Sequence, residues 1–240
     1  MSAPSLLKRD WTKDHVYLVQ FPRAGCIPTP SPFALKLETW LRCCDIPYTN
    51  VSNNFTTMSS KGQIPFVEDP DANLTPPEKA QFTAYRALIE NHLFWCLVYA
   101  RSRDNKWFGS EDKGFAGHLS GIKKTIFQNF LLERFRKKMF GAVNAQGTGR
   151  HNRLEVEKMA MEAFDSLENL IGTKPFFFGP NPTTFLFTPQ LSNELKRHLE
   201  EKCPCLTKMV HRIKDEFWPD WQEAIEKLSL DTKWKHDAVW

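Results

Sequence analysis

The sequence predicts an α+β protein in which a short mixed half precedes a long all-helical half. Three observations lead to this prediction. Val16–Phe21 is a short run rich in β-branched and aromatic residues, which is typical of a buried strand. Apolar residues between Phe33 and Cys44 recur at helical spacing. Beyond Thr75 the same helical spacing returns in several stretches, which favours a helical second half.

The first half is expected to contain three strands around one helix. A proline-rich loop follows the first strand, because Pro22, Pro28 and Pro30 prevent regular structure there. Ser31 offers an N-cap oxygen to the helix, and Pro32 takes the first helical position, where its missing N–H costs nothing. The helix is expected to end at Asp45-Ile46-Pro47. The second and third strands are expected in Tyr48–Asn54 and Gly62–Glu68.

The second half is expected to begin at a capping box formed by Thr75 and Glu78. Its helices are predicted up to about Arg101 and then over His118–Phe140, Val156–Ile171 and Leu206–Phe217. Gly147-Thr148-Gly149 is interpreted as a turn. We therefore expect a solvated tail in residues 1–15, a mixed domain in 16–70, a helical domain in 75–222 and a second tail in 223–240.

Composition limits the classes of function. A net charge of +4 over 240 residues gives no reason to expect a nucleic-acid partner. The longest apolar run, Leu93–Ala100, is far shorter than the ~20 residues of a membrane-spanning helix. Six cysteines without regular spacing fit a reducing compartment. We expect a soluble cytoplasmic protein with no transmembrane segment.

A set of motifs occurs in order through most of residues 13–221. They are Lys13–Arg23, Thr29–Pro32, Glu38–Arg42, Gly62–Phe66, Glu90–Trp95, Gly147–Arg150 and Arg212–Trp221. In this combination the chain resembles the failed axon connections branch of the metaxin and glutathione-transferase-like superfamily. The resemblance implies an incomplete thioredoxin-like N-terminal half, then a helical half like the C-terminal domain of glutathione transferases. It also implies a role in development or stress, mediated by interactions more than by turnover.

Two segments that this resemblance implies are missing. A fourth strand and its covering helix need ~20 residues, but only Asp69–Leu74 separates the third strand from Thr75. Thr183-Thr184 runs into Phe185–Pro189 where an Asp-capped buried helix is implied. We interpret both gaps as missing coding segments, in a splice variant or a flawed gene model. The third strand is then an unprotected edge, and the exposed face of the sheet is expected to be covered by the aromatic cluster Phe176-Phe177-Phe178 with Phe185 and Phe187.

Ser31 is the candidate catalytic residue. The resemblance places an active-site Ser, Tyr or Cys near the start of the first helix, where Ser31-Pro32-Phe33 stands. A hydroxyl there would hydrogen-bond the glutathione sulfur and lower its pKa, which assists attack on an electrophile. The alternative is that Ser31 only caps the helix, since Ser is among the preferred N-cap residues.

Gln63, Ile64 and Pro65 are the candidate glutathione-binding residues. Ile64-Pro65 resembles the family's cis-proline turn, whose backbone pairs with the cysteinyl unit of glutathione. The acidic residue and serine that normally hold the γ-glutamyl group belong to the missing fourth-strand region. Glutathione is therefore a possible but weakly held ligand.

Cysteines elsewhere give weaker indications. Cys26 precedes Ser31 but has no partner at Cys-x-x-Cys spacing, so it is interpreted as an ordinary loop residue. Cys203-Pro204-Cys205, with His198 and His211, fits no usual zinc spacing. The sequence therefore predicts no metal site.

Three functional hypotheses stay open. The first is a binding or scaffold protein with weak or no catalysis and an unidentified protein partner. The second is a serine-type glutathione transferase that joins glutathione to small electrophiles. The third is a defective isoform that does not fold cooperatively. Ser31 and Ile64-Pro65 favour the enzyme, whereas the missing fourth-strand region argues against it.

Overall fold

A computed structural model describes residues 15–53, 76–177 and 192–231 of the chain. Contacts between Cα atoms divide the chain into two compact units. Of the described residues, 15–53 and 214–231 belong to the first unit, and 76–177 and 192–213 belong to the second.

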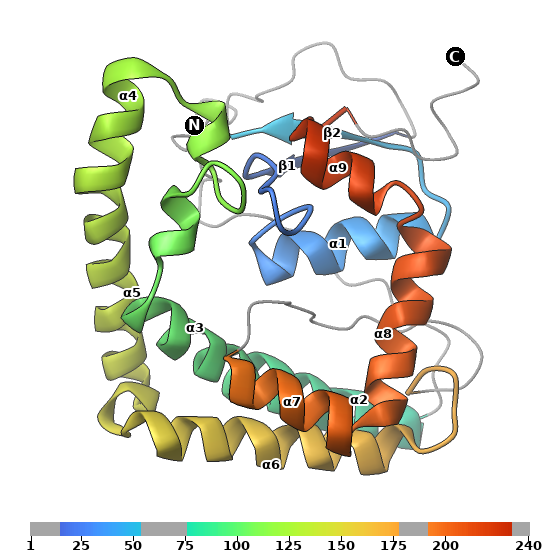
Figure 1. Cartoon of the computed structure of the whole chain (residues 1–240). Coiled ribbons are helices and arrows are strands. Elements are labelled where there is room, and N and C mark those ends of the chain that lie inside the picture. The colour runs from blue at the N-terminus through green and yellow to red at the C-terminus, as the bar shows by residue number, and fades with distance from the viewer. Residues whose placement is uncertain (1–14, 54–75, 178–191, 232–240) are drawn as a thin grey trace, which may run out of the picture. The chain divides into compact units, whose positions relative to one another are not determined.

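The first unit contains two parallel strands and a helix that packs against them. β1 (Val16–Gln20) pairs in parallel with β2 (Tyr48–Ser52), with Val16 opposite Tyr48. α1 (Pro32–Cys43) connects the two strands and lies along the sheet in Figure 1. One core cluster of this unit consists of Leu18, Leu37 and Leu41, each at most 7% exposed. The predicted β-α-β order and the predicted helix start are confirmed.

The C-terminal segment 214–231 also belongs to the first unit. It contains the last turn of α8 (Pro204–Phe217) and α9 (Trp221–Lys227). The sequence had suggested a helical domain as far as residue 222 and a tail beyond it. The structure differs because Trp218 and Asp220 make specific contacts with α1, so this segment packs with the N-terminal strands.

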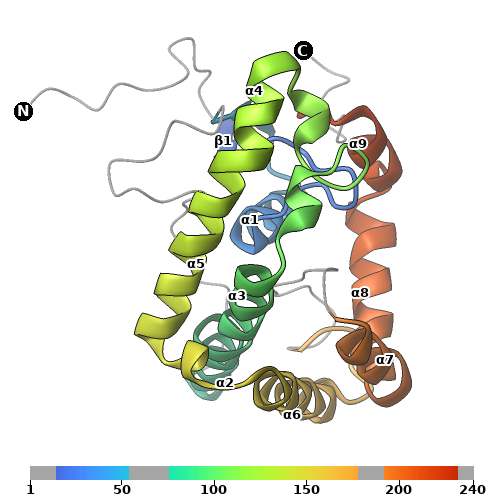
Figure 2. The ribbon, with the colours of Figure 1, turned by 60° about the vertical axis from the view of Figure 1, so that its left-hand side comes forward.

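The second unit is all helical. Its α-helices are α2 (Pro76–Leu88), α3 (Phe94–Arg103), α4 (Gly121–Ile126), α5 (Leu132–Gln146), α6 (Arg153–Ile171), α7 (Asn193–Lys202) and most of α8. Short π- and 3-10 helices join or extend them at Ile89–Leu93, Lys106–Gly109, Ala116–His118, Phe127–Leu131 and Thr148–Arg150. Figure 2 shows α3 between α5 and α6, and it contacts both helices.

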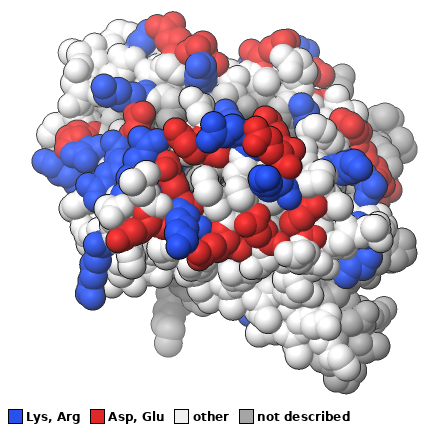
Figure 3. Space-filling model, turned by 60° about the horizontal axis from the view of Figure 1, so that its bottom comes forward, with Lys and Arg blue, Asp and Glu red and all other residues white. Residues whose placement is uncertain are grey.

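Local sequence signals explain the longest helix, α6. Asn152 and Glu155 form a reciprocal capping box at its start, and Gly172 ends it with φ of +54°. One face of the helix is buried through Val156, Ala160, Ala163, Phe164, Leu167 and Ile171. The outer face has i,i+4 ion pairs, and Figure 3 shows acidic and basic side chains intermixed on one face of the molecule. The predicted turn before α6 is confirmed, since Gly147 has φ of +116°.

Other segments discussed in the sequence analysis either have a definite place in the structure or fall outside the described residues. The charged segment from Asn193 to Lys202 forms a helix, α7, which buries Leu195. Phe176 and Phe177 belong to the second unit, where they contact Arg212 and Tyr85, while Phe178 lies outside the described residues. The third strand, the Thr75 cap and residues 183–189 lie outside the described residues.

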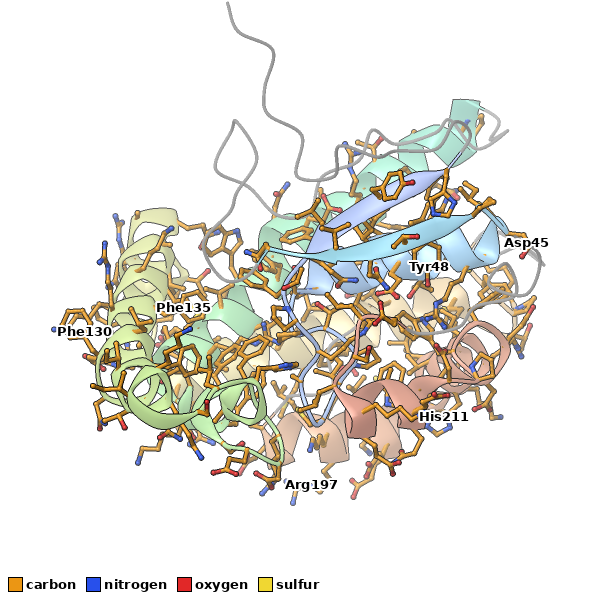
Figure 4. The ribbon with its side chains drawn as sticks, turned by 90° about the horizontal axis from the view of Figure 1, so that it is seen from above. Asp45, Tyr48, Phe130, Phe135, Arg197 and His211 are labelled. Atoms are coloured by element: carbon orange, nitrogen blue, oxygen red, sulfur yellow. The ribbon has the colours of Figure 1, made fainter. Side chains whose placement is uncertain are left out.

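The helical segment from α4 to α5 exposes a row of apolar side chains. They are Ile122, Ile126, Phe130, Leu131, Phe135 and Phe140, each at least 37% exposed. Figure 4 shows Phe130 projecting outward from its helix. Within the described part of the chain, no helix is both long and apolar enough to cross a bilayer.

Candidate functional site

Ser31 lies at the N-terminus of α1, as predicted. Its backbone is extended, and its side-chain oxygen accepts a hydrogen bond from the Ala34 N–H at 3.3 Å. The serine therefore caps the helix in the usual N-cap geometry. The cap uses the hydroxyl oxygen as an acceptor, so the hydroxyl hydrogen is not used by this contact. Capping and donation to a ligand are compatible at this position.

Gln63, Ile64 and Pro65 lie outside the described residues, so their predicted role in holding glutathione stays a prediction. Cys26 is half-buried and reduced. The five other cysteines are also reduced, and the pKa of each of those thiols is raised, chiefly by burial except at Cys205, where a hydrogen bond to Glu168 is the main cause. A raised pKa works against a nucleophilic thiolate.

The first unit also contains a buried polar network centred on Glu38 of α1. The Glu38 side chain is fully buried, and both of its oxygens accept bonds from Arg23 at 2.7 Å. The carboxylate also accepts hydrogen bonds from Gln20, Arg42, Tyr48 and Asn50 at 2.8–3.5 Å. Figure 4 shows Tyr48 on β2. A helix, two strands and the proline-rich loop thus converge on one carboxylate.

Arg42 extends this network to the C-terminal segment of the same unit. Its guanidinium makes two hydrogen bonds with the Asp220 carboxylate and donates to the Phe217 carbonyl at 3.1 Å. It also stacks 3.8 Å from the ring centroid of Trp218. The Trp218 Nε1–H donates to Thr39 Oγ1 at 2.9 Å. The whole arrangement therefore joins residues that are almost 180 positions apart.

Electrostatics keep these groups charged. Burial alone would raise the pKa of Glu38, but the charge and hydrogen bonds of Arg23, followed by the charge of Arg42, lower it from 4.5 to about 2. Burial would lower the pKa of Arg42, but hydrogen bonding to Asp220 and the charge of Glu38 raise it. Burial and the nearby Glu38 charge raise the pKa of Tyr48 above its usual range. Glu38 and Arg42 are therefore charged at neutral pH, whereas Tyr48 keeps its proton.

Two further polar atoms lie buried beside the β1–α1 loop. Gln20 Oε1 and Thr29 Oγ1 have no hydrogen-bond partner among the described residues. Both residues are fully buried. Such atoms are uncommon in folded proteins. Gln20 ends β1, and Thr29 lies in the loop two residues before Ser31.

The network was not identified from the sequence. Glu38 and Arg42 are spaced i,i+4 on a helix, which ordinarily indicates an exposed ion pair. The available signal was a charge at Glu38 next to Leu37, on the apolar side of the helix. The sequence contains no indication that Asp220 would reach this position.

Comparisons with known proteins agree with this architecture. Residues 32–73 match the glutathione S-transferase N-terminal domain family. The chain is 32% identical to Failed axon connections of Drosophila melanogaster over 93% of its own length and 63% of that protein. It is 25% identical to the isoprene-epoxide glutathione S-transferase of Rhodococcus sp. strain AD45, over 64% of this chain and 74% of that enzyme.

The alignment with the fly protein also bears on the missing segments. It extends over 266 positions, whereas 93% of this chain is about 223 residues. About 43 positions of that protein therefore face gaps in this chain. This number of positions is enough for the fourth strand with its covering helix and for the second helix that the sequence analysis found missing. The chain is therefore related to Failed axon connections, and its architecture fits an incomplete thioredoxin-like half followed by a helical half.

Proposed function

We propose that this chain is a non-catalytic or weakly catalytic binding protein with the fold of a glutathione transferase. The observation that carries the proposal is the buried charge network around Glu38. Among the described residues, the guanidiniums of Arg23 in the β1–α1 loop and of Arg42 in the last turn of α1 are paired with carboxylates of the chain itself, Glu38 and Asp220. Glutathione needs such groups for its own carboxylates. Its affinity at this site is therefore expected to be low.

The proposal includes the cytoplasm as its location and a protein as its principal partner. All six cysteines are reduced, which fits a reducing compartment. We also propose that the chain is a splice form, which would account for the internal gaps of the alignment with the fly protein. A developmental or stress-related role follows the relationship to Failed axon connections.

A serine-type glutathione transferase is the second candidate. It is favoured by Ser31 at the start of α1 and by the similarity to the Rhodococcus glutathione S-transferase. In that mechanism the Ser31 hydroxyl donates to the glutathione sulfur while its oxygen keeps the Ala34 contact. Glutathione or a small electrophile would then be the ligand, with Gln63–Pro65 holding the peptide backbone.

The two candidates are separated by a matched pair of serine variants. Ser31 and Ser192 cap α1 and α7 in the same way, each accepting from a backbone N–H at 3.3 Å. Ser31→Ala and Ser192→Ala should each lower the free energy of unfolding by about 1 kcal/mol through loss of the cap. Thermal unfolding is then measured for all three proteins with and without several millimolar glutathione, alongside conjugation to an epoxide.

For a binding protein we expect a cooperative melt that glutathione does not move, and no conjugation that depends on Ser31. The transferase candidate predicts an upward shift, which reaches about 2.7 kcal/mol when glutathione is at 100 times its dissociation constant. A shift and conjugation that are lost in Ser31→Ala and kept in Ser192→Ala would overturn our proposal. A wild-type chain without any cooperative transition would support the defective isoform.

A further inference from the structure

Three side chains with different metal-binding atoms meet in the second unit. They are Asp165 of α6, His198 of α7 and Cys203, which lies between α7 and α8. Their ligand atoms all lie within 4.8 Å of one another. His198 Nε2 is 2.6 Å from Asp165 Oδ1, and Cys203 Sγ is 3.8 Å from the same oxygen. The sequence predicts no metal site from the spacing of Cys203, Cys205, His198 and His211, and it gives no indication of Asp165, which lies 33 positions before His198.

The fold holds these three residues in place. Glu168, one turn after Asp165, accepts hydrogen bonds from the backbone N–H groups of Cys205 and Leu206 at 2.9 and 2.8 Å. This clamp fixes the start of α8 on α6. Cys203 is fully buried, whereas Asp165 is exposed, so the cluster is open to ions on one side. The position of the thiol is therefore set by backbone contacts and not by its own bond to Asp165.

The distances are close to those of a tetrahedral site. In such a zinc site the oxygen and nitrogen ligands lie about 3.3 Å apart, and the oxygen and sulfur ligands about 3.5 Å apart, from the usual bond lengths. The corresponding distances here are 2.6 and 3.8 Å. Side-chain rotations that move the Asp165 oxygen and the His198 nitrogen by about 1 Å would bring both atoms to ligating distances from an ion bound to Cys203.

The local charge also suits a cation. The Asp165 carboxylate contacts the Cys203 thiol, and the Glu168 carboxylate accepts hydrogen bonds from the backbone N–H groups of Cys205 and Leu206, so two negative charges lie beside the thiol. A bound cation would balance this charge. The same arrangement does not suit a nucleophilic cysteine, because the thiol donates to the Asp165 carboxylate and not to the imidazole.

We propose that Asp165, His198 and Cys203 form a binding site for a divalent transition-metal ion, with Zn²⁺ as the best match. One carboxylate oxygen, one imidazole nitrogen and one thiolate are the ligand types that Zn²⁺ takes in proteins. Three protein ligands leave the fourth tetrahedral position for water or another ligand. On binding, the metal replaces the thiol proton of Cys203, which is released to solvent.

The test uses Co²⁺ as a spectroscopic probe of the purified full chain, freed of metal by a chelator under reducing conditions. A thiolate bound to Co²⁺ gives a charge-transfer band in the near ultraviolet. We expect this band to reach saturation at one equivalent of Co²⁺ and to disappear when Zn²⁺ is added. Cys203→Ser should abolish the band, and circular dichroism should verify that the variant keeps its helices.

A second pair of variants keeps the test decisive if Cys203→Ser does not fold. His198→Gln removes a half-buried ligand and should reduce Co²⁺ uptake, whereas His211→Gln removes an exposed histidine of α8 and should leave it unchanged. Cys44→Ser serves as the thiol control, because Cys44 is exposed and belongs to the first unit. The absence of a band, equal loss in both histidine variants, or loss in Cys44→Ser alone would overturn the proposal.

Discussion

Glu38 shows how a single side chain can set the chemistry of its surroundings. A carboxylate without partners would be costly inside a protein, and burial of either arginine alone would be costly as well. Here both guanidiniums contact the same carboxylate, together with a phenol and two amides. The charges are balanced only as a group. Removal of one member is therefore expected to cost more than its own contacts suggest.

Glu38→Gln should lower the free energy of unfolding at neutral pH by about 3–5 kcal/mol, because it leaves buried guanidinium charge uncompensated. The folded-state pKa of Glu38, about 2, lies below its unfolded value, so the unfolded chain binds more protons between about pH 4.5 and 2. The stability that Glu38 contributes is therefore present above pH 4.5 and is lost as the pH falls toward 2. Urea unfolding of the parent chain and of Glu38→Gln across this pH range measures whether their free energies of unfolding converge.

Glu133→Gln is the matched control for this substitution. Glu133 also accepts two 2.7 Å hydrogen bonds from one guanidinium, that of Arg136, but the side chains of this pair are 46% and 34% exposed, whereas those of Glu38 and Arg23 are fully buried. The control should change stability little. Similar losses for both variants, or a Glu38→Gln deficit that persists at pH 2, would refute the electrostatic explanation.

At the scale of elements, α6 illustrates how local signals and burial combine. Its capping box and its terminal glycine set where the helix begins and ends, and both can be read from the sequence. Most of the stability of a helix in a protein nevertheless comes from the packing of its apolar face and not from its local signals. Leu167 is fully buried on that face, while Leu154 near the N-terminus is 76% exposed.

Leu167→Ala should destabilise the protein by about 2–5 kcal/mol, because it removes buried apolar surface and leaves a cavity. Leu154→Ala, a change of the same chemistry on the same helix, should stay within about 0.5 kcal/mol. Chemical denaturation followed by circular dichroism compares the two. A larger effect at position 154 would mean that α6 does not bury the face described above.

At the scale of the whole molecule, the first unit is built from both ends of the described chain. Residues 15–53 and 214–231 are joined through Arg42, Trp218 and Asp220. Asn50 adds a hydrogen bond to the Leu230 carbonyl at 3.2 Å. The C-terminal segment is therefore a structural part of the N-terminal unit and contributes to its stability.

Asp220→Asn should lower the free energy of unfolding by about 1.5–3 kcal/mol, because it weakens charge-assisted hydrogen bonds to a buried guanidinium. Asp215→Asn removes an exposed carboxylate of α8 and should have little effect. Thermal unfolding of the parent chain and the two variants measures both effects on stability. If both melt like the parent chain, the C-terminal segment does not support the N-terminal unit through Asp220.

The sequence by itself determined the order of elements, the Ser31 cap, the end of α6 and the resemblance to glutathione-transferase-like proteins. These features depend on short-range periodicity and on capping residues that lie within a few positions of one another. The tertiary structure alone decided that Glu38, Arg42 and Asp220 share a buried network, and that Asp165 joins His198 and Cys203. Arg42 and Asp220 are 178 positions apart, and Asp165 and His198 are 33 positions apart. Such pairs meet only when the helices pack, so the spacing of residues in the sequence does not reveal them.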